Sequence, residues 1–280
     1  MTKATIPIPK LIFYVLGDRP EALSPYLILE FIEGQKLDLK EVKALPEDSD
    51  KLNNLYTSLA DIYIQLRRLD FPSIGRLGFG LDGIQVASKT ISIDMNTQEL
   101  EGLQPSEIQT SYYSPDDRLV SANKYIDMLL DISANAFAKG QASVVEEDMG
   151  GDYLYHLDLF REFAQEWKDP TLDQGPFVLV HGYFQAFNLI VDQNMSILSA
   201  LDWEWSRIVP RQFFIPPIWL SVMATHYLAY EVFYQRYLKK FDLFVGHCPN
   251  PGSLKVWGTI ACRRMVQSQT QRPLPCRQRA

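Results

Sequence analysis

One stretch, residues 177–205, constrains the fold of this chain more than any other, because short apolar runs alternate in it with polar turns. The runs are Phe177–Val180, Leu189–Val191 and Ile197–Leu201. A short apolar run bounded by turn residues is typical of a buried strand. The polar triplet at residues 192–194 separates the last two runs as a tight turn would. The stretch therefore predicts three strands, the last two of which form a hairpin.

Two polar residues at the ends of this hairpin suggest a cation site. Asn188 immediately precedes the second strand, and Asp202 follows the third. Because the two strands are neighbours in one hairpin, both residues are expected to face the same point. Mg²⁺ prefers oxygen ligands, usually one or two from the protein and the rest from phosphates and water. We therefore predict a magnesium site at Asn188 and Asp202. The alternative is that both residues are structural, Asn188 in a turn and Asp202 as a helix cap.

This stretch resembles the catalytic and metal-binding loops of the aminoglycoside phosphotransferase and choline-kinase-like families. Their motif reads H-G-D-x-x-x-x-N, strand, turn, strand, Asp, and the matching residues here are His181, Gly182, Asn188 and Asp202. The continuation IVPRQFFIPPIWL resembles the fungal branch. The resemblance implies a protein-kinase-like α+β fold with ATP and Mg²⁺ as cofactors. It further implies that His181 braces the loop, whereas Glu204 is either an outer metal ligand or a surface carboxylate.

Tyr183 stands where these families carry their catalytic aspartate. That aspartate accepts the proton of the acceptor hydroxyl in phosphoryl transfer. A tyrosine hydroxyl ionises near pH 10, so only about one in a thousand is a base at pH 7, and a general base contributes roughly 10²–10⁴-fold. Residues 184–187 offer no carboxylate instead. We therefore expect an impaired, pseudokinase-like phosphotransferase; the alternatives are a low-activity small-molecule kinase and a non-catalytic interaction protein.

The first thirty-four residues are expected to contain the remnant of a small lobe. Apolar runs at Leu11–Leu16 and Tyr26–Ile32 predict an antiparallel hairpin. By the resemblance, backbone groups of Glu30, Phe31 and Ile32 form a hinge against an adenine ring; the alternative is two ordinary core strands. The family's glycine-rich loop and strand lysine would precede this segment. Since the sequence contains neither, we expect a truncated copy or a gene model cut at both ends.

Helices are predicted on both sides of residues 177–205. Apolar residues recur at a helical period over residues 52–69, 125–136 (with a start near 115–117), 153–167, 218–230 and 231–241. Asp48 or Ser49 is the expected N-cap of the first helix. Residues 74–87, with four glycines, predict a small hairpin, and residues 88–116 a polar surface excursion.

The order of these elements predicts an α+β protein with three regions. Residues 1–34 form the small-lobe remnant and hinge. Residues 35–245 form a mostly helical large lobe that contains the catalytic-type hairpin. Residues 246–280 form an irregular basic tail, whose last eighteen residues hold five arginines and no acid. Weak order is expected in that tail because it has few periodic apolar residues.

Composition limits the compartment and the partners. The formal net charge of −7 disfavours general nucleic-acid binding. The N-terminus lacks the long apolar core of a secretory signal, and the apolar residues 213–229 include prolines and a histidine, which favours a buried helix over a membrane span. Cys248, Cys262 and Cys276 show no metal-binding spacing, so reduced thiols in a cytoplasmic protein are expected. No pattern identifies the small-molecule acceptor, and a protein partner belongs to the interaction alternative.

Overall fold

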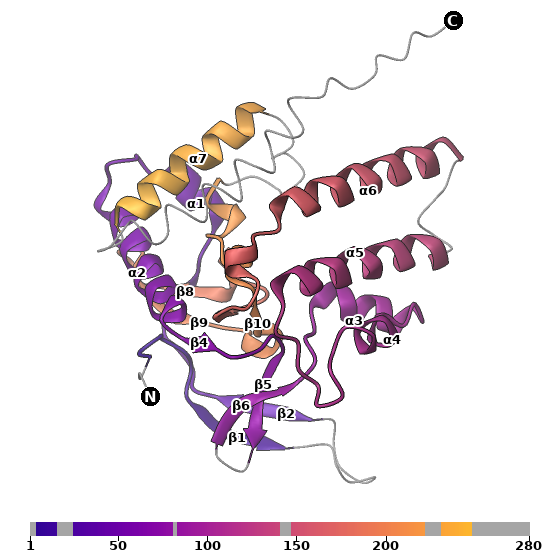
Figure 1. Cartoon of the computed structure of the whole chain (residues 1–280). Helices are drawn as coiled ribbons and strands as arrows, with labels where there is room; N and C mark the ends of the chain where they lie inside the picture. Colours follow the sequence, from indigo (N-terminus) through magenta and orange to yellow (C-terminus); the bar gives the residue numbers. More distant parts are fainter. Residues whose placement is uncertain (1–3, 16–24, 81–82, 141–146, 222–230, 248–280) are drawn as a thin grey trace, which may run out of the picture.

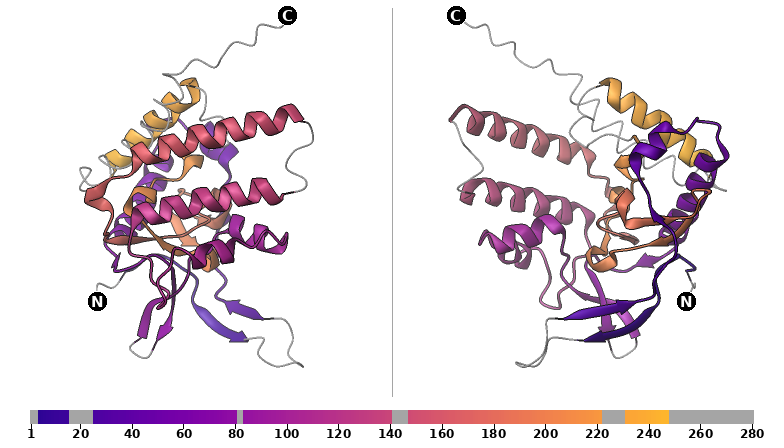
Figure 2. Two further views of the ribbon diagram at one scale, coloured as in Figure 1. Left: turned by 45° about the vertical axis from the view of Figure 1, so that its right-hand side comes forward. Right: turned by 180° about the vertical axis from the view of Figure 1, so that it is seen from behind.

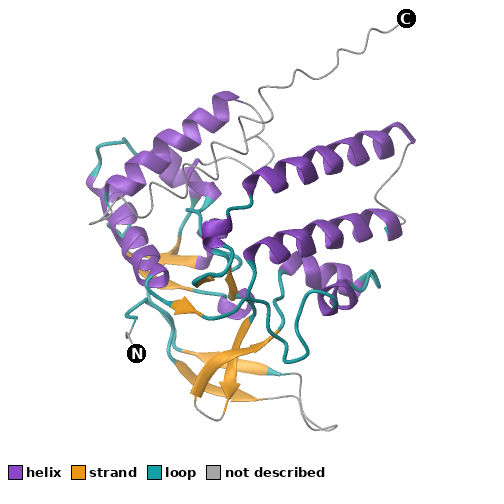
Figure 3. Ribbon diagram, in the orientation of Figure 1, coloured by secondary structure: helices purple, strands orange, loops and turns teal. Residues whose placement is uncertain are grey.

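The structure is a computed structural model, and it describes residues 4–15, 25–80, 83–140, 147–221 and 231–247. Within these residues helices and short strands are mixed, which confirms the predicted α+β class (Figures 1 and 3). Two hairpins project together at one end of the molecule, and the helices gather toward the other end (Figure 2). The hairpin that carries the predicted cation site lies between these ends.

The first projecting hairpin consists of β1 (Leu11–Val15) and β2 (Tyr26–Leu29), which pair antiparallel as predicted. Every side chain of β2 is exposed, as are four of the five in β1. The alternative of two ordinary core strands is therefore wrong. The second projecting hairpin, β5 (Arg76–Gly80) and β6 (Gly83–Ser88), confirms the prediction for residues 74–87.

The main core forms around α2 (Asp50–Arg67). Ser49 is its N-cap, because the Ser49 side chain accepts a hydrogen bond from the backbone N–H of Leu52 at 3.3 Å. The apolar face of α2, including the fully buried Leu55 and Leu59, contacts β7 (Phe177–Val180) and α7 (Glu231–Gly246). The short helix α1 (Leu39–Ala44) precedes it, and α7 extends five residues beyond the predicted end.

Two small antiparallel sheets hold the strands predicted in residues 177–205. One has the order β10-β7-β4, with bounds Arg207–Val209, Phe177–Val180 and Asp70–Phe71. The other has the order β3-β8-β9, with bounds Gln35–Lys36, Leu189–Val191 and Ile197–Ala200. All three predicted strands are present, and the last two pair as a hairpin. Periodicity did not reveal β3, β4 and β10, because two or three residues are too few for a pattern.

Residues 88–116 are not a surface excursion, and that prediction is wrong. They contain α3 (Ile93–Leu100) and α4 (Pro105–Thr110). Met95 of α3 and Gln109 of α4 are buried, and the Gln109 amide donates to the backbone carbonyl of Thr90 at 3.0 Å. Each helix buries so few side chains that its sequence reads as polar. Capping at Ser92, whose side chain accepts from the Met95 N–H at 3.1 Å, was the available signal.

Two long helices, α5 (Ala122–Lys139) and α6 (Glu147–Trp167), run side by side away from the sheets (Figures 1 and 2). The start of α5 that the sequence predicted near residues 115–117 is wrong. There the Ser114 side chain accepts from the Arg118 N–H at 3.0 Å and donates to the Arg118 carbonyl at 2.8 Å, which closes a turn. The helix begins after Ser121, which caps it.

Parts of two predictions lie outside the described residues. Of the predicted helix at 218–230, only Ile218–Ser221 is described, as one 3₁₀ turn called η5. The tail from residue 248, including the three cysteines, is likewise outside the described part. Across the ranges that the structure does describe, none of the helices combines the length and the hydropathy needed to cross a membrane.

Candidate cation and nucleotide site

The hairpin of β8 and β9 brings Asn188 and Asp202 together along the backbone. Leu189 lies opposite Ala200, and the N–H of Leu201 donates to the carbonyl of Asn188 at 2.8 Å. Asn188 therefore lies across from the residue that precedes Asp202. The turn at the other end is held by the Asp192 carboxylate, which accepts two backbone N–H groups at 2.8 Å each. This turn fixes the register of the strands and with it the position of the pair.

The Asn188 side chain is held in one orientation. It is 2% exposed, and its Nδ2 donates to the backbone carbonyl of Tyr183 at 2.9 Å. Its backbone N–H donates to Gln185 at 3.0 Å, within the one-turn helix η2 (Ala186–Asn188). Because the nitrogen of the amide is engaged by the loop, the carbonyl oxygen Oδ1 is the end that can serve a cation.

Asp202 is exposed to solvent and lies two residues after the end of β9. Its backbone is left-handed, with φ 60° and ψ 54°, where β9 gives way to the one-turn helix η3 (Trp203–Trp205). A non-glycine residue in this region is uncommon, and such residues gather at functional sites. Groups of three or more His, Cys, Asp or Glu side chains suited to a metal do not occur in the described part of the chain. One amide oxygen and one carboxylate fit Mg²⁺, which takes its other ligands from phosphates and water.

His181 joins the loop to the end of the hairpin. It is 3% exposed; its Nε2 lies 2.6 Å from the carbonyl of Leu201, and its Nδ1 accepts from the Tyr183 N–H at 3.3 Å. One nitrogen donates and the other accepts, which is the pattern of a neutral imidazole. Burial lowers the pKa of His181, although the Leu201 carbonyl and the nearby Asp202 charge oppose that shift. This position suits a bracing role better than proton transfer.

Gly182 permits the loop to pass close to the segment after the hairpin. Its φ is +82°, and a Cβ atom there would lie 1.9 Å from the carbonyl oxygen of Trp205. No other residue type fits without moving the backbone. Arg207 approaches the same carbonyl, with its Nη1 donating at 3.5 Å. The motif match at Gly182 thus has a steric cause.

Sequence reasoning missed the aromatic residues that enclose the loop. The His181 ring lies 4.5 Å from the Trp203 ring and 5.0 Å from the Phe184 ring, measured between centroids. Trp203 donates from Nε1 to the carbonyl of Ala200 at 2.9 Å, and Trp219 donates to that of Phe184 at 2.7 Å. The tryptophans in segments 203–205 and 218–220 could have indicated this enclosure. A buried indole N–H needs a hydrogen-bond acceptor, and backbone carbonyls are the usual choice.

Tyr183 is half-buried at the predicted base position. Its ring packs edge-on against Phe187 with 5.6 Å between centroids, and its carbonyl orients Asn188. The structure therefore gives Tyr183 a backbone role in the site. Glu204 is exposed on η3, so both of its alternatives stay open.

The predicted hinge leads directly into the sheet of the hairpin. The backbone N–H of Glu30 donates to the carbonyl of Lys10 at 2.8 Å, and the Glu30 carboxylate accepts from the backbone N–H of Lys10 at 3.2 Å. Phe31 is 88% exposed, and within the described residues no backbone hydrogen bond engages Phe31 or Ile32. A few residues later β3 pairs with β8. The segment 30–32 is thus linked to the hairpin by chain and by sheet, with backbone groups left for a ligand.

Comparison with known proteins identifies the family. A model of the phosphotransferase enzyme family (APH) matches residues 1–213. Among solved structures, a thermostable mutant of aminoglycoside phosphotransferase APH(4)-Ia, in ternary complex with AMP-PNP and hygromycin B, aligns at 17% identity and a TM-score of 0.44, covering 95% of this chain and 79% of that one. A type I macrolide 2′-phosphotransferase aligns at 11% identity and a TM-score of 0.34, covering 88% and 68%. No curated protein gave a significant sequence match. The family match spans well over half of the 280 residues, so this chain belongs to the phosphotransferase enzyme family.

Proposed function

We propose that the β8–β9 hairpin binds a magnesium–nucleotide complex, and that phosphoryl transfer to a small-molecule hydroxyl is impaired in this chain. The observation that supports the proposal is the 2.8 Å hydrogen bond from the Leu201 N–H to the Asn188 carbonyl, which places the backbone of Asn188 beside the residue that precedes Asp202. Asn188 Oδ1 and Asp202 would hold the ion. When bound, Mg²⁺ neutralises charge on the nucleotide phosphates.

The adenine end of the nucleotide would lie at residues 30–32. The backbone groups of Phe31 and Ile32 are without backbone partners within the described ranges, and β3 ties this segment to β8. Hydrogen bonds from such groups would orient the base, as the family resemblance implies.

Impairment follows from the loop that carries Tyr183. A phosphotransferase positions its acceptor hydroxyl with a carboxylate that takes the proton. The Tyr183 ring packs on Phe187 instead, and residues 184–187 supply no acid. Since the transition state of phosphoryl transfer is loose, the loss of a base reduces the rate without abolishing it. The rate would then depend mainly on how the site positions water or the acceptor hydroxyl relative to the terminal phosphate of the nucleotide.

The test compares Tyr183→Asp and Tyr183→Phe with the wild type in an ATP-hydrolysis assay, which needs no knowledge of the acceptor. Restoring the carboxylate is expected to raise turnover roughly 10²-fold or more, while removing the hydroxyl leaves it unchanged. Mg-ATP is expected to raise the melting temperature of all three proteins, as any ligand of the native state does. An unmoved melting temperature would contradict nucleotide binding, and an inactive Tyr183→Asp protein that still binds would contradict the role of the missing base.

A low-activity kinase is the first alternative, and the same assay separates it from the proposal. If the Tyr183 hydroxyl positions the acceptor, Tyr183→Phe loses most of the wild-type turnover. The proposal predicts no such loss, because in it the Tyr183 hydroxyl neither positions nor deprotonates the acceptor.

A non-catalytic interaction protein is the second alternative, and the exposed β1–β2 hairpin is the observation that favours it. The exposed side chains of its two described strands are large aliphatic or aromatic groups, including Phe13 and Leu27, and exposed apolar patches mark interfaces or aggregation sites. Size-exclusion chromatography with light scattering decides: a stable dimer or a copurifying partner supports this alternative, and a monomer at tens of micromolar counts against it.

A further inference from the structure

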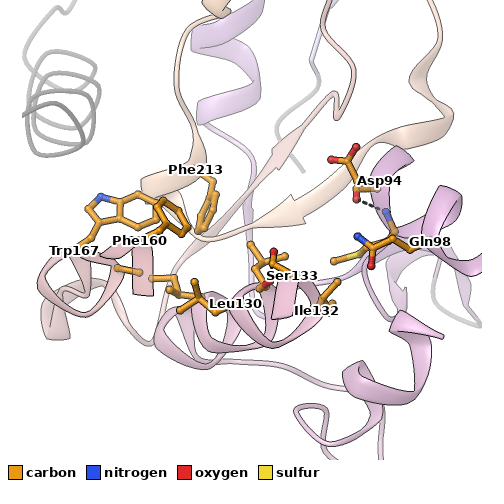
Figure 4. A pocket seen from close by; sticks show the side chains of 13 residues that line it. Asp94, Gln98, Leu130, Ile132, Ser133, Phe160, Trp167 and Phe213 are labelled. Carbon is orange, nitrogen blue, oxygen red and sulfur yellow. Dashed lines mark hydrogen bonds between the residues drawn. The ribbon is translucent and has the colours of Figure 1, made fainter. Parts of the chain in front are cut away.

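A separate cavity lies among α3, α5, α6 and the one-turn helix η4 (Arg211–Phe213), away from the β8–β9 hairpin. Its volume is about 280 Å³. Aromatic side chains close one end, with Trp167, Phe160 and Phe213 side by side, and the polar residues Asp94 and Gln98 lie at the other end (Figure 4). Neither the cation pair nor the loop around Tyr183 contributes to its lining.

The walls between these ends are mostly apolar. Ile126, Leu130, Ala164 and Trp167 form a small core of their own, joined by Phe213. Phe213 is held from two sides, since its ring lies 5.0 Å from that of Trp167 and 5.2 Å from that of Tyr125. Trp167 and Phe213 therefore form a fixed surface, and a flat apolar ring would gain contact area on it without reorganising the site.

The polar end contains an unsatisfied acceptor. Gln98 lines the cavity, and its Oε1 is buried without a hydrogen-bond partner among the described residues. Buried polar atoms are normally hydrogen-bonded, and each exception needs a reason. Ser133, across the cavity, donates its hydroxyl to the carbonyl of Leu129 at 2.9 Å, so that hydrogen is not available to Gln98. Within the described residues, no group donates a hydrogen bond to Gln98 Oε1.

We propose that this cavity binds a small, largely apolar molecule that has a flat ring and one hydrogen-bond donor. The ring lies against Trp167 and Phe213, and the donor meets Oε1 of Gln98. A cavity of about 280 Å³ is near the lower end of ordinary ligand sites, which favours a molecule of one or two rings over an oligosaccharide. This site does not depend on the proposed phosphotransferase activity.

The test uses two probes of nearly equal shape, 2-naphthol and 2-methoxynaphthalene, which differ in that only the first donates a hydrogen bond. Binding to the full chain is measured by calorimetry at pH 7. The wild type is expected to bind 2-naphthol saturably and at least about 10-fold more tightly than the ether, because the ether leaves the buried oxygen unpaired. Gln98→Met removes the acceptor at similar volume and is expected to bring the two affinities within about 2-fold.

Two further variants complete the test. Gln193→Met makes the same substitution at an exposed turn of the hairpin and is expected to keep the 10-fold preference. Ala164→Phe fills the cavity and is expected to abolish binding of both probes. If that protein does not fold, the Gln98→Met comparison decides alone. The proposal is overturned if 2-naphthol does not saturate, if the ether binds equally well to the wild type, or if Gln98→Met keeps the preference.

Discussion

Two antiparallel hairpins with short strands have opposite surroundings in this molecule. The β8–β9 hairpin is buried: Leu189 is 0% exposed, and α2 contacts it through Ser58, whose hydroxyl accepts the Ile197 N–H at 3.1 Å. The β1–β2 hairpin projects from the body, and Leu27 is 64% exposed. Both sequences are apolar runs around a polar turn. Local pattern thus predicts the hairpin, whereas burial depends on what the rest of the chain places against it.

The difference also separates the two halves of the candidate site. The buried hairpin fixes the backbone of Asn188 and Asp202 from both strands. The exposed hairpin leads to the predicted hinge at residues 30–32 and leaves it open. We therefore expect the cation pair to be rigid and the adenine contacts to be weak.

The largest predicted effect comes from truncating one leucine in each hairpin. Leu189→Ala leaves a cavity in the core and is expected to lower the free energy of unfolding by about 2–5 kcal/mol. Leu27→Ala removes an exposed side chain and is expected to change it by less than about 0.5 kcal/mol. Urea denaturation of both variants measures the contrast. Equal losses would show that the β1–β2 hairpin is covered in solution.

The next effect concerns the loop that meets the buried hairpin. Gly182→Ala places a Cβ atom against the Trp205 carbonyl at φ +82°, and we expect it to cost about 1–3 kcal/mol and to weaken Mg-ATP binding. Gly102→Ala is the matched control, because its φ is +78° and nothing lies within 4 Å of the new atom. Thermal unfolding of the two variants separates the clash from the backbone strain. If both lose the same stability, close approach to Trp205 is not what requires Gly182.

The smallest predicted effect is a pH dependence at His181. Burial lowers its pKa in the folded protein, so between that value and the ordinary one near 6.5 the unfolded chain binds more protons. Stability is therefore expected to be retained above pH 6.5 and to fall as the pH drops below it. His181→Asn should flatten this dependence between pH 7 and pH 5.5, although it lowers stability at every pH. A variant with the same slope as the wild type would show that other groups are responsible.

Local signals were sufficient to predict the hairpin that carries the candidate cation pair. Asn188 and Asp202 flank two strands whose register is set by the turn at Asp192. This turn lies within ten residues of both, so the hairpin could be predicted without knowledge of a distant contact. The Ser49 cap and the apolar face of α2 were predictable for the same reason. These features depend on residues close together in the sequence.

The missed features depend on distant parts of the chain. β3 is two residues long and exists because it pairs with β8, more than 150 residues later. The enclosure of His181 by Trp203, and of Phe184 by Trp219, likewise depends on the folded chain. The helices α3 and α4 bury too few side chains to show a period. Burial and pairing of this kind are set by tertiary packing and not by local pattern.

Magnesium-dependent nucleotide binding tests the central claim most directly. Calorimetry of ATP with the wild type, Asp202→Asn and Glu204→Gln, each with Mg²⁺ and with EDTA, separates the predicted ligand from the neighbouring exposed carboxylate. We predict that the wild type binds ATP at least about 10-fold more tightly with Mg²⁺, that Asp202→Asn loses this gain, and that Glu204→Gln keeps most of it. Binding that is unaffected by Mg²⁺, or a gain that survives in Asp202→Asn, would contradict the account.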